Sequence, residues 1–236
     1  MEDHESHCWS VSLPVPSDAC AALYATLSPE ERTRSARFRS ERDRQRFIVA
    51  RGALRELLGR YLGIQPADIR FEYNANGKPA LSADFGSRLT FNLSHSADLA
   101  LIAIARDMDV GVDVERISEG PRSEYAEIAR CFFSAAEVEE LCSVPPPLYA
   151  RAFFTCWTKH EACIKARGEA IGDGRIDASA PIYTLQPASG YVGALALVSF
   201  PRHAKTGGCA PLWRRRLLHD PGDRQIPGLR LLRAFV

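Results

Sequence analysis

An α+β fold with two pseudo-equivalent subdomains is predicted by three features of the sequence. Short alternating or apolar segments predict strands, among them 99–105 and 110–117. Two long stretches, one in each half, carry apolar residues at helical spacing. The order strand, major helix, further strands occurs in both halves. We therefore expect an N-terminal subdomain over 1–108 and a C-terminal subdomain over 109–200.

Helices in the first half are marked by capping residues. Asp18–Leu27 predicts a short helix, and Ser28-Pro29-Glu30-Glu31 combines a capping box with proline at the first helical position. Ser40 caps the next helix. Its apolar residues, from Phe47 to Tyr61, follow spacings of 3, 4, 3, 1 and 3, which predicts one buried face, and Gly63 ends it.

The strands of the first half are separated by turn-forming sequences. Trp9, Val11 and Leu13 alternate and are followed by prolines, which predicts the first strand. Asn74–Pro79, with the sequence NANGKP, predicts a turn after a strand at 69–73 and exposes a lysine. Ser94-His95-Ser96 is expected in the hairpin-like connection between strands 89–93 and 99–105.

The second half predicts more helix. Glu124–Phe133 is expected to be helical, and Ser134-Ala135-Ala136-Glu137 is a capping box. Leu148–Arg167 predicts the second long helix. Tyr183–Leu185 and Val192–Phe200 predict a hairpin. The segment 201–236 is basic and apolar without clear periodicity, so we expect a loosely attached or disordered tail.

Composition favours a cytoplasmic protein. The formal net charge is +1, which gives no bulk electrostatic argument for nucleic acid or membrane. The seven cysteines form no CxxC pair and no zinc spacing, so they are interpreted as reduced thiols. The N-terminus MEDHESH is no signal peptide, and the most apolar run, Leu99–Ala105, is too short to span a bilayer.

The segment Val110–Ile117, VGVDVERI, is the strongest candidate for a functional site. Its valines form one face of a strand, while Asp113 and Glu115 project from the other, about 7 Å apart along the strand. One magnesium ion can bridge such a pair, together with phosphate oxygens and water. The alternative is a half-buried strand with a solvated acidic side.

A third carboxylate lies on the second long helix. Glu161 falls inside the apolar arc of Leu148–Arg167, between Trp157 and Phe154, where burial is costly unless the charge is paired or bound to metal. One interpretation is a structural pair of Glu161 with Lys165 at i,i+4. The other is a third acidic ligand beside the acidic strand.

Arginines crowd residues 32–60 and allow two interpretations. Arg44, Arg51 and Arg55 share one helix face, which is solvated in the first interpretation. In the second, they hold an acidic ligand together with Arg34, Arg37 and Arg46, and phosphate is the natural candidate. Lys78 is interpreted as a solvated loop residue. His95 is either an ordinary loop residue or a donor to a phosphate, and Ser94 and Ser96 add hydroxyls beside it.

Six segments occur in an order that resembles one family. They are RFRSERDRQRFIVARGALRELL, NGKPAL, FNLSHSADLALIAIA, VGVDVERI, FFSAAEVEEL and FFTCWTKHEACIKARG. This series, over about 28–168 with a weaker echo at 182–198, resembles the larger, Sfp-like 4′-phosphopantetheinyl transferases. The resemblance implies two α/β subdomains related by a pseudo-twofold, with coenzyme A between them.

The resemblance also implies an activity of the holo-[acyl-carrier-protein] synthase type. Such an enzyme transfers phosphopantetheine from coenzyme A to a serine of an apo acyl or peptidyl carrier protein and releases 3′,5′-ADP. By motif position, the Mg²⁺ ligands are Asp113, Glu115 and Glu161, and the catalytic residues are Glu161 and Lys165. The residues expected to contact coenzyme A are Arg34, Arg46, Arg51, Lys78, Ser94, His95 and Lys165.

Three departures from the family leave alternatives open. His160 stands where the family usually has lysine, the segment 169–182 is shorter than expected, and the tail after Pro201 is atypical. A catalytically weakened module that binds coenzyme A or carrier protein is therefore the alternative to an active enzyme. An unrelated arginine-rich nucleic-acid binder is a third hypothesis. The resemblance implies a monomer without nucleic-acid or membrane partners, and leaves fatty-acid, polyketide and peptide-synthetase carriers open.

Overall fold

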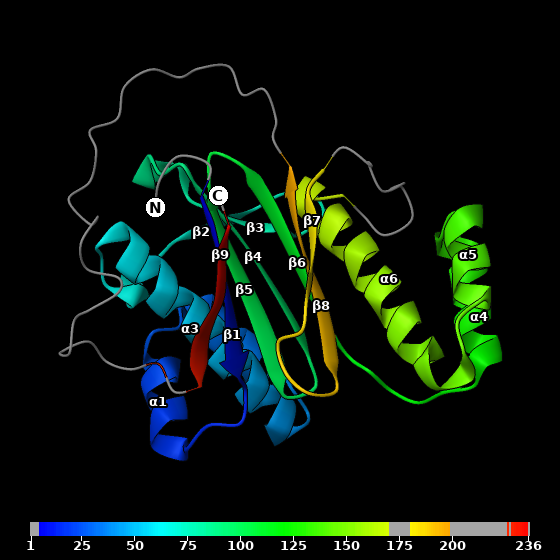
Figure 1. The fold of residues 1–236 in the computed structure, drawn as a ribbon. Helices are drawn as coiled ribbons and strands as arrows, with labels where there is room; N and C mark the ends of the chain where they lie inside the picture. The colour runs from blue at the N-terminus through cyan, green and yellow to red at the C-terminus, as the bar shows by residue number, and fades with distance from the viewer. Residues whose placement is uncertain (1–4, 170–179, 199–225, 227, 236) are drawn as a thin grey trace.

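The computed structural model describes residues 5–169, 180–198, 226 and 228–235 (Figure 1). Its helices and strands confirm the α+β prediction. The first sheet has the antiparallel order β4-β5-β1-β9. Its strands are β1 (Ser6–Ser12), β4 (Leu89–Ser96), β5 (Leu99–Arg106) and β9 (Leu229–Phe235). The helices of this half are α1 (Ser17–Ala25), α2 (Pro29–Ser35) and α3 (Glu41–Leu62).

The second sheet has the antiparallel order β6-β8-β7. Its strands are β6 (Asp109–Arg116), β7 (Ile182–Leu185) and β8 (Tyr191–Val198). The helices of this half are α4 (Arg122–Phe132), α5 (Ala135–Cys142) and α6 (Pro146–Arg167). A small ribbon of β2 (Phe71–Tyr73) and β3 (Pro79–Leu81) lies between the short 3₁₀ turns η1 (Pro66–Asp68) and η2 (Ala83–Phe85).

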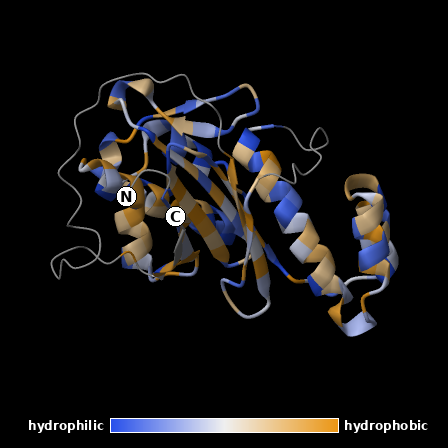
Figure 2. Cartoon of the chain, turned by 45° about the horizontal axis from the view of Figure 1, so that its top comes forward, coloured by the Kyte–Doolittle hydropathy of each residue, from blue (hydrophilic) through white to orange (hydrophobic). Residues whose placement is uncertain are grey.

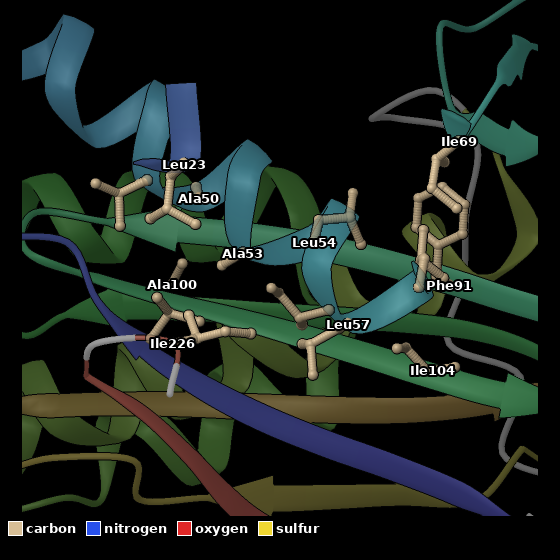
Figure 3. Close-up of a cluster of buried hydrophobic side chains, with 14 of the residues drawn as sticks. Leu23, Ala50, Ala53, Leu54, Leu57, Ile69, Phe91, Ala100, Ile104 and Ile226 are labelled. Carbon is tan, nitrogen blue, oxygen red and sulfur yellow. The ribbon is translucent and has the colours of Figure 1, made fainter. Parts of the chain in front are cut away.

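The two sheets are layered between the two long helices, with α3 outside the first and α6 outside the second (Figure 1). Side chains of α3 meet the first sheet, as Leu54 and Leu57 do near Ala100 and Ile104 in Figure 3. A second apolar cluster joins the two sheets and includes the valines of β6. Figure 2 shows the resulting pattern, with hydrophobic residues concentrated in the central strands and mixed along the helices. The other face of β6 packs against α6.

Local capping signals predicted the helix ends well. Ser28 and Ser134 both form the expected capping boxes, and the Ser40 side chain accepts the Asp43 N–H at the start of α3. Gly63 ends α3 in the left-handed region with φ of 70°, a conformation that favours glycine. The hairpin predicted at 183–185 and 192–200 is β7 and β8, and its last two residues, 199 and 200, lie outside the described residues.

The prediction that Ser94-His95-Ser96 lies in a connection is wrong. β4 continues through Ser96, which pairs with Leu99, so only Ala97 and Asp98 form the turn. Ala97 has φ of 48°, a strained value for a residue with a Cβ. Ser94 and Ser96 therefore share one face of β4, and His95 points to the opposite face.

The interpretation of 201–236 as a loosely attached tail is wrong for its last part, because Leu229–Phe235 forms β9 and pairs with β1. Residues 201–225, 227 and 236 lie outside the described residues, as does 170–179 of the shortened segment. The boundary at 108/109 and the pseudo-twofold stay predictions. In the described part of the chain, none of the helices combines the length and apolarity that crossing a membrane requires.

Candidate functional site

Asp113 is the centre of a polar cluster built from β4, β6 and α6. Its side chain is almost fully buried, at 2% exposure. Ser94 donates its hydroxyl to Asp113 Oδ1 over 2.7 Å, and Lys165 Nζ lies 2.5 Å from the same oxygen. Lys165 Nζ also donates to Ser94 Oγ over 3.2 Å. Three residues that the sequence analysis treated separately are thus in direct contact.

Glu115 lies two residues further along the same face of β6. Its Oε2 accepts a hydrogen bond of 2.7 Å from Ser96, the second serine of β4. Burial raises the pKa of Glu115, the Ser96 hydrogen bond opposes this, and the negative charge of Asp113 adds to the rise. The sequence predicted a hydroxyl from Ser96 beside His95 but not its hydrogen bond to Glu115, although its alternation with Ser94 was a usable signal.

Glu161 completes a set of three carboxylates. It is 8% exposed, and its Oε2 lies 3.9 Å from Lys165 Nζ. Burial raises the pKa of Glu161, Lys165 lowers it, and Asp113 raises it further. Glu161 therefore pairs loosely with Lys165, which contacts Asp113 more closely, and its role as a third acidic ligand stays a prediction.

Gly111 explains how α6 comes this close to β6. A Cβ built on Gly111 would lie 2.0 Å from the carbonyl oxygen of Ala162 and 2.3 Å from the backbone nitrogen of Ala166. Any side chain at this position would therefore push α6 away from β6. The glycine of VGVDVERI thus brings Glu161 and Lys165 to the acidic strand.

The donor set fits a hard divalent cation. Asp113 Oδ2 is buried and has no hydrogen-bond partner among the described residues, an unusual state for a carboxylate oxygen. The oxygens of Glu115 and Glu161 belong to the same polar cluster, since each carboxylate interacts with Asp113 and Lys165. Carboxylate oxygens of this kind are the ligands that Mg²⁺ prefers.

Basic side chains line hollows beside β4. One hollow of about 320 Å³ is bordered by Arg34, Arg51, Tyr73 and His95. A second, of about 350 Å³, shares His95 and is bordered by Arg46. Burial lowers the pKa of His95, and the charges of Lys165 and Arg46 lower it further. Four of the residues predicted to contact coenzyme A therefore border adjoining hollows.

Each of these arginines already has an interaction within the chain. Arg46 pairs with Asp98 over 2.8 Å and with Asp43 over 3.0 Å. Arg51 pairs with Glu31 and donates to the Tyr73 hydroxyl over 2.9 Å. The Arg34 guanidinium lies 5.4 Å from the ring centre of Phe47. These contacts hold the guanidinium groups in place at the edge of the hollows.

Arg55 differs from the solvated helix face considered for the arginines. It is 1% exposed, donates to Glu31 Oε2 over 2.6 Å, and donates to the carbonyl oxygens of Pro66 and Ile69. A buried guanidinium needs such partners. Arg55 is therefore a structural residue that ties α3 to α2.

Lys78 contacts α6. Its Nζ donates to the carbonyl oxygen of Ala166 over 2.8 Å and lies 3.4 Å from that of Val110. Asn74 and Asn76 from the same loop donate to the Gly168 carbonyl oxygen. The NANGKP turn therefore binds the C-terminal end of the helix that carries Glu161 and Lys165.

Comparisons with known proteins agree over most of the chain. Residues 11–107 match the family model described as 4′-phosphopantetheinyl transferase, N-terminal, and residues 109–202 match the 4′-phosphopantetheinyl transferase superfamily. The chain is 41% identical to the 4′-phosphopantetheinyl transferase HetI of Nostoc sp., over 71% of this chain and 70% of that protein. A putative 4′-phosphopantetheinyl transferase of Synechocystis sp. is 34% identical over 80% of this chain and 78% of that protein. The human L-aminoadipate-semialdehyde dehydrogenase-phosphopantetheinyl transferase is 30% identical over 62% of this chain and 50% of that protein.

Proposed function

Because the chain belongs to the 4′-phosphopantetheinyl transferase superfamily, we propose that it is an Mg²⁺-dependent enzyme that modifies carrier proteins. It transfers phosphopantetheine from coenzyme A to a serine of an apo acyl or peptidyl carrier protein and releases 3′,5′-ADP. The observation that carries the metal dependence is the buried Oδ2 of Asp113, which has no hydrogen-bond partner in the described part of the chain. Asp113, Glu115 and Glu161 are the residues that would hold the ion.

The reaction breaks a pyrophosphate bond, so charge develops on the leaving phosphate. Mg²⁺ bound by the three carboxylates would neutralise part of that charge. Lys165 supplies a second positive charge at the same place, because its ammonium group already contacts Asp113 and Ser94. The ammonium group can donate to a phosphate oxygen without leaving this cluster.

Glu161 is the group that we assign to proton removal. The attacking serine belongs to the carrier protein, so its hydroxyl proton needs an acceptor in this chain. Burial of Glu161 raises its pKa, which makes it a better proton acceptor than an exposed glutamate. Glu161 itself, or a water that it holds, takes the proton.

The hollows beside β4 are the proposed binding region for coenzyme A. Arg34, Arg46, Arg51 and His95 border them and present donors suited to phosphates. Ser94 joins this region to the carboxylates, since it precedes His95 on β4 and donates to Asp113. The diphosphate can thus reach the acidic strand while the rest of coenzyme A lies over basic side chains.

A weakened binding module is the second candidate, motivated by His160 and the short 169–182 segment. The structure gives His160 a partner on α5, because its Nε2 lies 3.1 Å from Glu137 Oε1. Its imidazole therefore interacts with Glu137, which is not one of the three carboxylates of the proposed metal site, whereas Lys165 contacts Asp113 directly. These contacts favour the active enzyme.

The test is the intact mass of an apo carrier protein after incubation with this protein, coenzyme A and Mg²⁺. Fatty-acid, polyketide and peptide-synthetase carriers form the panel, and EDTA is the metal control. We expect one phosphopantetheine per carrier serine, lost with EDTA and with Asp113→Asn. Glu119→Gln, which removes an exposed carboxylate four residues after Glu115, is the matched control and keeps the wild-type rate.

If no carrier is modified while coenzyme A binding is still measurable by calorimetry, the proposal of an active enzyme is wrong and the weakened binding module takes its place. Wild-type transfer by Asp113→Asn would refute the metal assignment. The carrier panel also identifies the acceptor class, which the sequence leaves open. The monomeric state and the cytoplasmic location stay predictions from sequence.

A further inference from the structure

A second cluster of ligand-type side chains lies between α5 and α6, outside the carboxylate site. Glu137 Oε1 lies 3.1 Å from His160 Nε2 and accepts a hydrogen bond of 3.4 Å from Cys156 Sγ. His160 is 7% exposed. Oxygen, sulfur and nitrogen ligand atoms thus lie close together among residues to which the proposed transferase chemistry gives no role.

We propose that Glu137, Cys156 and His160 form a three-residue site for a divalent metal ion of the zinc class. All three ligand atoms lie within 4.8 Å of one another. With the usual zinc bond lengths, tetrahedral ligands are separated by roughly 3.3 Å for nitrogen and oxygen and roughly 3.5 Å for sulfur and oxygen. The observed 3.1 and 3.4 Å are close to these values.

The helical arrangement suits chelation. Cys156 and His160 are four residues apart on α6, so they lie on one face one turn apart, as paired metal ligands on helices do. Glu137 comes from the first turn of α5. Two ligands from one helix and one from its neighbour leave a fourth position for water, which the partly exposed side chain of Glu137 allows.

Surrounding contacts hold the ligands in place. The second carboxylate oxygen of Glu137 accepts from the backbone N–H and the hydroxyl of Ser134 over 2.8 and 2.7 Å. The Phe133 ring stacks on the His160 imidazole at 4.9 Å between ring centres. Such supporting contacts orient first-shell ligands in known metal sites.

The same atoms are paired by hydrogen bonds without a metal, so the metal-free structure does not leave them unsatisfied. The ion would replace the thiol proton of Cys156, which now faces Glu137 and would be released to solvent, and His160 would carry its ring proton on Nδ1 so that Nε2 can bind the ion. Glu137 would exchange two hydrogen bonds for one metal–oxygen bond while keeping its contacts to Ser134.

Co²⁺ titration in excess Mg²⁺ is the test, because a cobalt–thiolate bond gives a charge-transfer absorption that carboxylates do not. We expect this band at one equivalent in the full chain and its removal by Zn²⁺. Cys156→Ser abolishes it, and His160→Gln weakens cobalt binding by more than about tenfold. The matched control changes Cys131, Cys142 and Cys209 to serine together and keeps the band.

No thiolate band in the wild-type chain would overturn the proposal, and so would a band that persists in Cys156→Ser. Melting of each variant without metal shows whether it is folded. If Cys156→Ser fails that check, weaker cobalt binding by His160→Gln and persistence of the band in the triple-cysteine control assign the band to this site instead. The carboxylates around Asp113 give no thiolate band whether or not they hold Mg²⁺, so failure of that site does not affect the readout.

Discussion

Gly111→Ala tests the idea that close approach of β6 and α6 builds the catalytic site. The added Cβ would lie 2.0 Å from the Ala162 carbonyl oxygen, whereas ordinary contact begins near 3.4 Å. The backbones of β6 and α6 would have to separate by about 1.4 Å, and no flexible side chain can absorb the clash. Overpacking of this kind costs about 1–3 kcal/mol. For a chain of this size, that lowers the melting temperature by about 2–12 °C.

The same separation moves Glu161 and Lys165 away from Asp113. A misplacement of about 1 Å at reacting groups can reduce rates about 100-fold. We therefore expect Gly111→Ala to remain folded but to transfer phosphopantetheine about 100-fold more slowly. Initial rates of carrier modification, measured well below the melting temperature and corrected for the folded fraction by circular dichroism, provide the assay.

Gly52→Ala is the matched control. Its Cβ would lie 2.7 Å from Leu23 Cβ, at the contact between α1 and α3, so it also destabilises the fold. The gain in helix propensity, about 1 kcal/mol, offsets part of that cost. We expect lower stability with a wild-type rate per folded molecule. If Gly111→Ala also kept the wild-type rate, or if both glycine variants slowed transfer equally, the close approach would not be what positions the site.

Three further outcomes are expected. Glu31→Gln leaves the buried Arg55 guanidinium without its counter-charge and lowers the free energy of unfolding by about 3–5 kcal/mol in urea titrations. Glu30→Gln, which changes an exposed neighbour, lowers the free energy of unfolding far less. Equal losses in the two variants would contradict this prediction. Lys165→Met removes the charge that lowers the pKa of Glu161, so in the metal-free protein the Glu161 carboxyl titrates at higher pH in NMR spectra than in the wild type, and an unmoved titration would argue against this. Glu115→Gln raises the melting temperature of the metal-free protein at pH 7, because the raised pKa of Glu115 makes its ionisation destabilising. This gain in melting temperature disappears below pH 4, where the wild-type carboxyl is protonated. A lower melting temperature of Glu115→Gln at pH 7 would contradict this prediction.

Local chemistry made much of this structure predictable. The capping boxes at Ser28 and Ser134 are decided by four residues each, and both form as expected. The alternation of Val110–Ile117 likewise places the valines and the carboxylates of β6 on opposite faces. These features depend on neighbours in the chain, which a sequence displays directly.

Features that depend on distant partners were missed. The turn at Ala97 and Asp98 lacks glycine, so nothing in the sequence marked it as the hairpin turn, and Ser96 was assigned to a loop. β9 forms because β1 offers an edge more than 200 residues away. Arg55 is buried because Glu31 approaches from another helix. Spacing within one element contains no information on such pairings.

The NANGKP turn shows how one residue can serve both halves of the molecule. The last carbonyl groups of a helix have no partners within the helix, and positive charge is favourable there. Lys78 supplies that charge to the end of α6, while Asn74 and Asn76 bind the Gly168 carbonyl oxygen. A coenzyme A phosphate that recruited Lys78 would have to compete with these carbonyl groups. Phosphate binding and the position of α6 are therefore linked through this one side chain.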